Sequence, residues 1–151
     1  MSNMRELYQE MILDNHKHPR NFGRLAGANC HAEGFNPLCG DRVTVYARVE
    51  GGDIRDLSFE GSGCAICMAS ASLMTDELAG RSIDHADKLF VQFHDLVTGE
   101  SAKSPDVDAL GKLAVFMGVR EFPVRVKCAT LPWHALRAAL KDGAKAPVST
   151  E

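Results

Sequence analysis

Four residues from three distant parts of the sequence carry side chains that a metal ion takes as ligands. They are Cys39, Asp41, Cys64 and Cys128. A single glycine separates the first cysteine from the aspartate, so the backbone can bend until both side chains point to one atom. Three thiolates and one carboxylate suit a tetrahedral Zn²⁺ ion. The sequence therefore predicts one zinc–thiolate centre, and the plain alternative is a turn cysteine and a turn aspartate that bind no metal.

The residues beside the predicted ligands suit a negatively charged centre. Zn²⁺ with three thiolates and a carboxylate carries a net charge of about −2. Basic residues stand close to the ligands in the sequence: Arg42, Arg125 and Lys127. Cys64 also stands at the expected start of a helix, where the helix dipole and free N–H groups favour a thiolate. We expect the basic side chains to offset the charge of the centre.

Two other motifs point to different chemistry. The segment Cys64-Ala65-Ile66-Cys67 resembles a thioredoxin-type C-x-x-C, but that motif belongs to a βαβ unit and not to a hairpin. His31-Ala32-Glu33 with the same cysteine pair imitates a zinc deaminase, but Gly34 and Pro37 interrupt the helix that would carry the histidine and glutamate. Neither motif uses the other predicted ligands, so both are the weaker interpretations.

Two cysteines remain outside the predicted centre. Cys67 stands one helical turn from Cys64 and could serve as a spare ligand or a resolving thiol. A buried small residue in a tightly packed helix is the simpler interpretation of this cysteine. Cys30 has no evident partner in the sequence, and we assign it no role.

A β-hairpin is predicted immediately after the first two ligands. Residues 42–49 alternate, with valines and an alanine on one face and polar residues on the other, and residues 54–60 repeat the pattern. The glycine-rich stretch 50–53 between them is typical of a tight turn. Residues 31–35 predict a short third strand. We therefore expect a small antiparallel sheet of about three strands.

Helical spacing of apolar residues dominates the rest of the chain. Helices are predicted at 4–16, at 65–79, from the Ser82 cap to Gly99, at 106–117, and from Pro123 to about Leu140. A kink or restart is expected at Pro132, because proline removes the hydrogen bond to the Cys128 carbonyl. Residues 100–106 are predicted to form an exposed loop. Residues 143–151 lack periodicity and are expected to be a disordered tail.

Composition limits the class of protein. A chain of 151 residues with a net charge of −3 is long enough for one hydrophobic core, and its charge favours neither nucleic acid nor membrane as a partner. No apolar run approaches the ~20 residues that span a bilayer, and the first residues lack the layout of a signal peptide. The expected compartment is the cytoplasm. Five cysteines there favour metal or thiol chemistry over a disulfide framework.

The chain resembles the SufU type of the IscU/NifU-N-terminal family, whose proteins act in iron–sulfur cluster biogenesis. The similarity extends over nearly the whole chain. Four motifs carry it: Asn36-Pro37-Leu38-Cys39-Gly40-Asp41, Gly61-Ser62-Gly63-Cys64-Ala65-Ile66, Ala69-Ser70-Ala71-Ser72-Leu73-Met74-Thr75, and Gly118-Val119-Arg120-Glu121-Phe122-Pro123-Val124-Arg125-Val126-Lys127-Cys128.

Two features resemble the SufU type more than the scaffold branch of this family. Scaffold proteins carry a histidine just before the last cysteine, where this chain has Lys127. The chain also has an extra stretch, around 98–109, that scaffolds lack. Two residues depart from the family pattern: Cys67, where many relatives have serine, and Pro132 in the last helix.

The resemblance implies an IscU/SufE-like α+β domain over residues 1–142, with helices covering one face of the sheet. It also implies a zinc-dependent sulfurtransferase with Cys39, Asp41, Cys64 and Cys128 as ligands and Cys39 as sulfur acceptor. The implied partners are a SufS-type cysteine desulfurase and, downstream, a SufBCD-type scaffold. The alternatives are a scaffold that holds a transient iron–sulfur cluster on the same cysteines, and a zinc-stabilised binding module without turnover.

Overall fold

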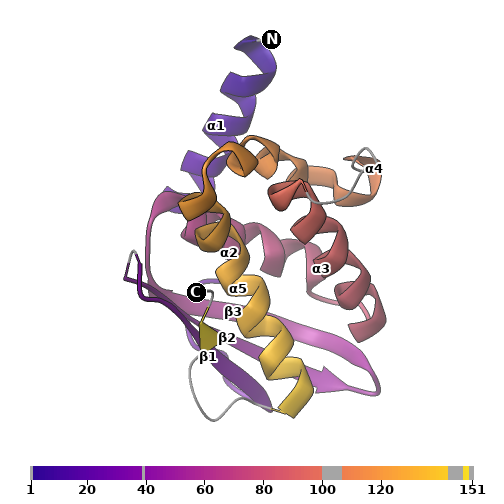
Figure 1. Cartoon of the computed structure of the whole chain (residues 1–151). Helices are drawn as coiled ribbons and strands as arrows, with labels where there is room; N and C mark the ends of the chain where they lie inside the picture. Colours follow the sequence, from indigo (N-terminus) through magenta and orange to yellow (C-terminus); the bar gives the residue numbers. More distant parts are fainter. Residues whose placement is uncertain (1, 39, 100–106, 143–147, 150–151) are drawn as a thin grey trace.

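The computed structural model describes residues 2–38, 40–99, 107–142 and 148–149. Its helices and strands follow the chain in this order: α1 (Ser2–Lys17), β1 (Cys30–Asn36), β2 (Asp41–Glu50), β3 (Asp53–Ser62), α2 (Ala65–Leu78), α3 (Ile83–Thr98), α4 (Val107–Leu110), the 3₁₀ helix η1 (Gly111–Glu121), α5 (Pro123–Asp142) and β4 (Val148–Ser149). Figure 1 shows the sheet with helices packed over one face. The predicted α+β architecture is confirmed.

The sheet has the strand order β3-β2-β1-β4. The strands β1, β2 and β3 pair antiparallel, as predicted, and the two-residue β4 pairs parallel to β1. Gly51 and Gly52 form the turn between β2 and β3, both with positive φ. Of the disordered tail predicted at 143–151, the structure describes only residues 148–149, which form β4. Residues 143–147 and 150–151 lie outside the described residues.

Helix α5 packs on β1 and β2 and brings the last predicted ligand over the sheet. Gly34 in β1 makes this close contact possible. A Cβ atom at Gly34 would stand 3.0 Å from Leu131 Cδ1 and 3.3 Å from Ala135 Cβ. Helix α2 packs beside α5 and against β3 (Figure 1), so the two ligand-bearing helices share one face of the sheet.

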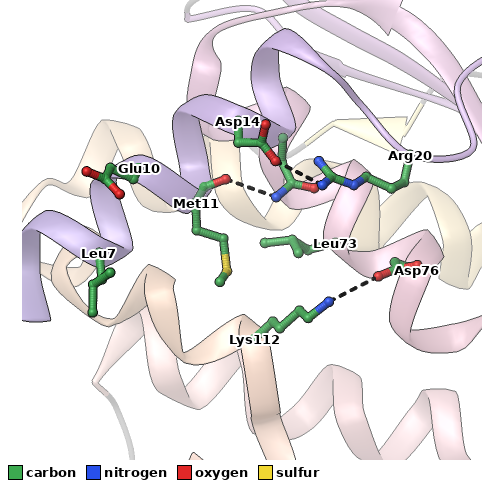
Figure 2. A pocket seen from close by; sticks show the side chains of 9 residues that line it. Leu7, Glu10, Met11, Asp14, Arg20, Leu73, Asp76 and Lys112 are labelled. Carbon is green, nitrogen blue, oxygen red and sulfur yellow. Dashed lines mark hydrogen bonds and ion pairs between the residues drawn. The ribbon is translucent and has the colours of Figure 1, made fainter.

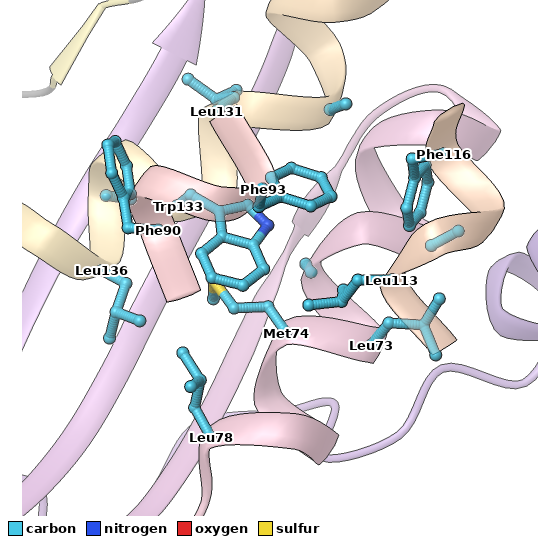
Figure 3. Packing of buried hydrophobic residues seen from close by; sticks show 14 of the residues in the cluster. Leu73, Met74, Leu78, Phe90, Phe93, Leu113, Phe116, Leu131, Trp133 and Leu136 are labelled. Atoms are coloured by element: carbon cyan, nitrogen blue, oxygen red, sulfur yellow. The ribbon is translucent and has the colours of Figure 1, made fainter. Parts of the chain in front are cut away.

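The core centres on Trp133, which links three helices (Figure 3). Its ring stacks on Phe93 of α3 with 4.7 Å between centroids. Its indole Nε1 donates to Ser70 Oγ of α2 at 3.1 Å, and Ser70 Oγ donates to the Ala129 carbonyl of α5 at 2.6 Å. A buried indole N–H and a buried serine hydroxyl are thus both satisfied, and the chain of hydrogen bonds joins α2 to α5.

The structure differs from the sequence-based prediction in two helices. The helix expected over 106–117 is instead α4 followed by the 3₁₀ helix η1, because Gly111 adopts φ +56° and interrupts the α-helix. Of the kink or restart predicted at Pro132, the restart is wrong, since α5 runs as one helix through this proline. The kink stays a prediction. Buried residues on both sides of Pro132 hold α5 in place despite the missing N–H donor. The predicted loop at 100–106 lies outside the described residues.

In the part of the chain that the structure describes, every helix is too short or too polar to cross a bilayer.

Gly61 in β3 provides a test of the close strand packing before α2. It adopts φ +143°, and a Cβ atom there would stand 2.2 Å from the Arg42 carbonyl oxygen. We expect Gly61→Ala to lower the free energy of unfolding by about 2–4 kcal/mol, because both backbone strain and a backbone clash oppose the methyl group. Urea denaturation measures the change.

Gly52→Ala is the matched control for this variant. Gly52 also has a positive φ, +81°, but no atom would lie within 4 Å of its Cβ. The control therefore carries the backbone cost alone, about 1 kcal/mol. Equal losses in the two variants would contradict a steric role for the Arg42 carbonyl.

The burial of His134 leads us to expect that the stability of the protein depends on pH. Burial lowers the pKa of His134 below its usual 6.5, and His94 and Arg137 lower this pKa further. A lowered pKa means that the folded protein disfavours the protonated form. The contribution of the neutral His134 to stability is therefore fully present above pH 6.5 and is lost as pH falls through and below that value. We expect the urea concentration at the unfolding midpoint to be lower at about pH 5 than at about pH 7. In His134→Phe this difference between the two pH values should be smaller.

The exposed His16 supplies the control for the pH dependence. His16→Gln should leave the slope of stability against pH unchanged. An unchanged slope in His134→Phe would refute the assignment of the dependence to this histidine.

Candidate metal centre

Three of the four predicted ligands meet at one point in the structure. Asp41 is the first residue of β2, Cys64 is the N-cap of α2, and Cys128 lies in the second turn of α5. One ligand atom from each of the three residues lies within 4.8 Å of the others. The fourth predicted ligand, Cys39, lies outside the described residues. The fold therefore places two sulfurs and a carboxylate oxygen together from three separate elements.

The Asp41 carboxylate is almost fully buried, with 2 % of the residue exposed. Its Oδ1 accepts a hydrogen bond from the Cys64 backbone N–H at 2.9 Å, and its Oδ2 lies 3.6 Å from Cys64 Sγ. A buried carboxylate is costly unless a donor or a cation compensates it. One N–H bond provides part of this compensation, and a bound cation would supply the rest.

The position of Cys64 favours a thiolate. As N-cap of α2, its sulfur accepts a hydrogen bond from the Cys67 backbone N–H at 3.5 Å. The hydrogen bond with Cys128 lowers the pKa of Cys64 most, and the Cys67 N–H lowers it further, while burial and the Asp41 charge raise it. The resulting pKa is about 6. The thiolate is thus the main form near neutral pH, which is the form that binds metals.

Arg125 is the basic residue that faces the two thiols. The negative charge of Cys64 is the largest cause that raises the pKa of Arg125, and the charge of Cys128 and hydrogen bonds to both sulfurs add to it. Arg125 is exposed, so its guanidinium can contact the centre and a bound partner at the same time.

Arg42 does not take the place that the sequence predicted for it. Its guanidinium pairs with Glu33 at 3.0 Å and lies over the ring of Phe35. Successive residues of a strand point to opposite faces, so Asp41 turns into the core and Arg42 turns out. Arg42 therefore does not offset the charge of the centre.

Gly63 allows the ligands to approach one another. A Cβ atom at Gly63 would lie 3.1 Å from Asp41 Cγ and 3.3 Å from Cys67 Cβ, both tighter than ordinary contact. Any larger residue here would press against the Asp41 carboxylate. The glycine-rich stretch before Cys64 is thus a packing requirement of the centre.

Asn36 is a residue of the site that the sequence analysis did not single out. It is fully buried, its Oδ1 accepts from the Leu38 N–H at 3.1 Å, and its carbonyl accepts from the Gly40 N–H at 2.8 Å. Its Nδ2 atom has no hydrogen-bond partner among the described residues. Asn36 therefore holds the backbone of Leu38 and of Gly40, and Gly40 adopts φ +75°. An asparagine three residues before a cysteine at a glycine turn was the available signal.

Exposed apolar side chains stand on the segments that carry the ligands. They are Leu38, Phe122 and Val124, each more than half exposed. Exposed large apolar residues, such as Phe122 and Val124 at the start of α5, are available to a protein partner.

A separate hollow of about 300 Å³ lies between α1, α2 and η1 (Figure 2). Two ion pairs stand on its rim, with Arg20 2.9 Å from Asp14 and Lys112 3.7 Å from Asp76. Asp76 and Cys64 are separated by about three helical turns along α2. The hollow is therefore distinct from the metal centre.

The donor set fits Zn²⁺, which binds sulfur and oxygen ligands in four-coordinate sites. Two thiols, one of them with a lowered pKa, and a buried carboxylate are donors that a soft to borderline metal prefers. The same donors also suit iron, so the geometry alone does not choose between these metals.

Comparison with known proteins gives consistent results. The family model for the NifU-like N terminal domain matches residues 7–142. The zinc-dependent sulfurtransferase SufU of Bacillus subtilis is 40 % identical over 135 residues, which are 89 % of this chain and 90 % of that protein. The iron–sulfur cluster assembly scaffold protein IscU of Streptococcus pyogenes serotype M1 is 36 % identical over 151 residues, which are 100 % of this chain and 93 % of that protein.

A solved structure agrees in fold. The crystal structure described as that of an iron–sulfur cluster assembly scaffold protein for the SUF system (FiSufU) from Fervidobacterium islandicum AW-1 superposes with a TM-score of 0.82. Its sequence is 37 % identical, and the match covers 90 % of this chain and 98 % of that chain.

Zinc binding should depend on the residues that meet at the centre. We expect one zinc ion to stabilise the protein by about 2.7 kcal/mol at a free concentration 100 times its Kd. Cys128→Ser should abolish most of this stabilisation, because it replaces the buried sulfur of a candidate ligand. Thermal unfolding of metal-free protein with and without zinc measures the effect.

Cys30→Ser is the matched control, because Cys30 lies far from the candidate ligands. Asn36 at one end of β1 pairs with Asp41, whereas Cys30 at the other end pairs with Ala47. It should keep the full stabilisation by zinc. A Cys128→Ser protein that zinc stabilises as much as the unmodified chain would rule out Cys128 as a ligand.

Proposed function

The chain belongs to the NifU-like N-terminal domain (IscU/SufU) family of iron–sulfur cluster assembly proteins, and we propose that within it the protein is a zinc-dependent sulfur carrier. It accepts persulfide sulfur from a SufS-type cysteine desulfurase on Cys39. The observation that carries the proposal is the convergence of Asp41, Cys64 and Cys128 within 4.8 Å. The similarity to a zinc-dependent sulfurtransferase supports zinc as the metal.

Four residues of the chain would hold the zinc: Cys39, Asp41, Cys64 and Cys128. Bound zinc keeps its cysteine ligands deprotonated and protects them from oxidation. The residues of the chain do the rest. The Cys64 N–H positions the Asp41 carboxylate, and Arg125 supplies positive charge beside the two thiols. Arg125 is therefore suited to orient an incoming anionic persulfide.

The transfer step is a thiol–persulfide exchange. The Cys39 thiolate attacks the outer sulfur of the desulfurase persulfide, and a sulfur–sulfur bond forms on Cys39. The sulfur–sulfur bond on the desulfurase breaks, and its cysteine leaves as a thiolate. One sulfur atom moves with no net oxidation or reduction, and each side keeps one negative charge. The step therefore needs no external oxidant or reductant.

The surface near the centre is suited to a protein partner. Leu38, Phe122 and Val124 expose apolar area on the turn before Cys39 and at the start of α5. A desulfurase that covers this area would exclude water from the exchange. Downstream, a SufBCD-type scaffold would receive the sulfur. Free thiols at the centre require a reducing compartment, and we propose the cytoplasm.

The second candidate function is an iron–sulfur cluster assembly scaffold. Its support is the IscU relative, which is 36 % identical over the full length of this chain. The same thiolates would hold a nascent cluster. Lys127 argues against this function. It stands just before Cys128, at the position where the scaffold branch of the family carries a histidine. A cluster absorbs visible light and zinc does not, so the colour of protein reconstituted with iron and sulfide separates the two functions.

Desulfurase turnover tests the sulfur carrier directly. We expect the protein to accelerate cysteine desulfuration at least about tenfold in the absence of iron. Cys39→Ala should abolish the acceleration and keep the fold, because the acceptor thiolate is lost. Cys30→Ser should behave like the unmodified protein. Alkylation followed by mass analysis should locate one extra sulfur atom on Cys39.

Two outcomes would contradict this function. A coloured cluster without acceleration would favour the scaffold. Binding of the desulfurase without acceleration, together with unfolding on zinc removal, would indicate a zinc-stabilised binding module.

A further inference from the structure

Asn36 carries a buried hydrogen-bond donor that the fold does not use. The residue is fully buried, and its Nδ2 atom has no hydrogen-bond partner among the described residues. Burying an amide N–H without an acceptor destabilises a protein, because the group loses its bonds to water. Such groups are rare in native structures, and each calls for an explanation.

The other polar atoms of Asn36 are engaged by the backbone. Its Oδ1 accepts from the Leu38 N–H at 3.1 Å, and its carbonyl accepts from the Gly40 N–H at 2.8 Å. Turning the amide over would place its NH₂ group against the Leu38 N–H, so the oxygen and nitrogen positions are fixed by this bond. The backbone thus uses the oxygen of the side chain and leaves the nitrogen for another acceptor.

Asn36 lies beside the candidate metal centre. It is the last residue of β1 and pairs with Asp41, the first residue of β2. Both are buried, whereas Phe35 is half-buried and Arg42 is exposed, so Asn36 and Asp41 share the face that the helices cover. Residues directly opposite in an antiparallel pair have Cβ atoms about 4.5–5.5 Å apart. The Asn36 amide therefore borders the carboxylate whose ligand atom lies within 4.8 Å of two sulfurs.

The ligand atoms of the centre are acceptors of the right kind. The Asp41 Oδ1 already accepts the Cys64 N–H at 2.9 Å, and neither carboxylate oxygen accepts from Asn36 Nδ2. The ligand sulfurs remain. A thiol is a weak acceptor, but metal binding converts it to a thiolate, which is a better one. Metal binding would therefore create the acceptor for the Asn36 amide.

We propose that Asn36 is a positioning residue of the metal centre, whose Nδ2–H donates to a metal-bound thiolate; the inference rests on the metal centre of the proposed function. Hydrogen bonds from outside the ligand set orient metal ligands, and losing one typically weakens metal binding about tenfold to a hundredfold. The Cys67 N–H, which donates to Cys64 Sγ at 3.5 Å, makes a bond of the same kind from α2. Asn36 supplies the corresponding bond from the sheet.

Cadmium-113 in place of zinc tests the proposal in the unmodified protein. A proton that is hydrogen-bonded to a cadmium-bound sulfur couples to the cadmium nucleus, so a proton–cadmium correlation spectrum detects the bond directly. We expect a cross-peak from the Asn36 side-chain N–H. The Cys67 backbone N–H is the positive control, since it donates to Cys64 Sγ. Asn15 is the negative control, because it is also buried but its Nδ2 donates to the Met11 carbonyl at 2.9 Å.

The outcomes separate this proposal from the proposed function. A Cys67 cross-peak without one from Asn36 would overturn the role of Asn36 and leave the metal centre intact. Protein that binds no cadmium would overturn the centre itself, and the role of Asn36 with it. The desulfurase takes no part in the measurement, so a failure of sulfur transfer is recorded separately. If cadmium binds and neither cross-peak is seen, the zinc affinity of a variant decides.

That variant is Asn36→Ser, which separates the donor from the hold on the backbone. A serine hydroxyl can accept the Leu38 N–H as asparagine does at turns, but the side chain is too short to replace the amide donor. We expect zinc binding to weaken at least about tenfold, measured by competition with a chelator. Asn15→Ser removes a buried amide that lines the separate hollow and should keep the affinity of the unmodified protein. Equal zinc affinity in Asn36→Ser and the unmodified protein would refute the proposal.

Discussion

The hydrogen-bond chain from the Trp133 indole through the Ser70 hydroxyl to the Ala129 carbonyl joins the two helices that position the candidate ligands Cys64 and Cys128. Ala129 follows Cys128 directly, and Ser70 lies in the same helix as the Cys64 cap. A shift of α5 against α2 would break this buried chain and leave polar groups unsatisfied, which is costly in an apolar core. The distance between the two sulfurs is therefore tied to the packing of the core.

Asp41 has two roles that share one side chain. Its carboxylate accepts the N–H of Cys64 and so fixes the start of α2 to the start of β2. The same carboxylate lies close enough to both sulfurs to share a metal with them. Because the helix start and the ligand set depend on one buried group, a bound cation would stabilise the fold at the place where it is used.

The candidate centre combines buried residues with exposed neighbours. Asp41 and Cys128 are buried, whereas Arg125 and the apolar residues Leu38 and Phe122 are exposed. Two of the candidate ligands are thus shielded from water, while exposed side chains stand on the neighbouring segments. Protection and access are provided by different residues of the same segments.

Much of the fold follows from local sequence signals. The alternation of valines in β2 and the glycine pair after it predicted the hairpin, and Ser82 caps α3 as expected by accepting the His85 N–H at 3.0 Å. These signals act between near neighbours in the chain, so they can be recognised without the rest of the protein. Two of the candidate donors could be recognised in the same way, because Asp41 and Cys64 each stand beside a glycine in the sequence.

Tertiary packing decided the remaining features. Proline inside a helix costs roughly 3 kcal/mol, and α5 continues through Pro132 because its neighbours Leu131 and Trp133 are buried in the core. Sequence proximity suggested Arg42 as a counterion, but strand alternation directs it to Glu33. The sequence by itself determined the donors, the hairpin and most helix limits. Only the packing of α5 and α2 on the sheet decided which donors meet, since their distances depend on contacts between residues far apart in the chain.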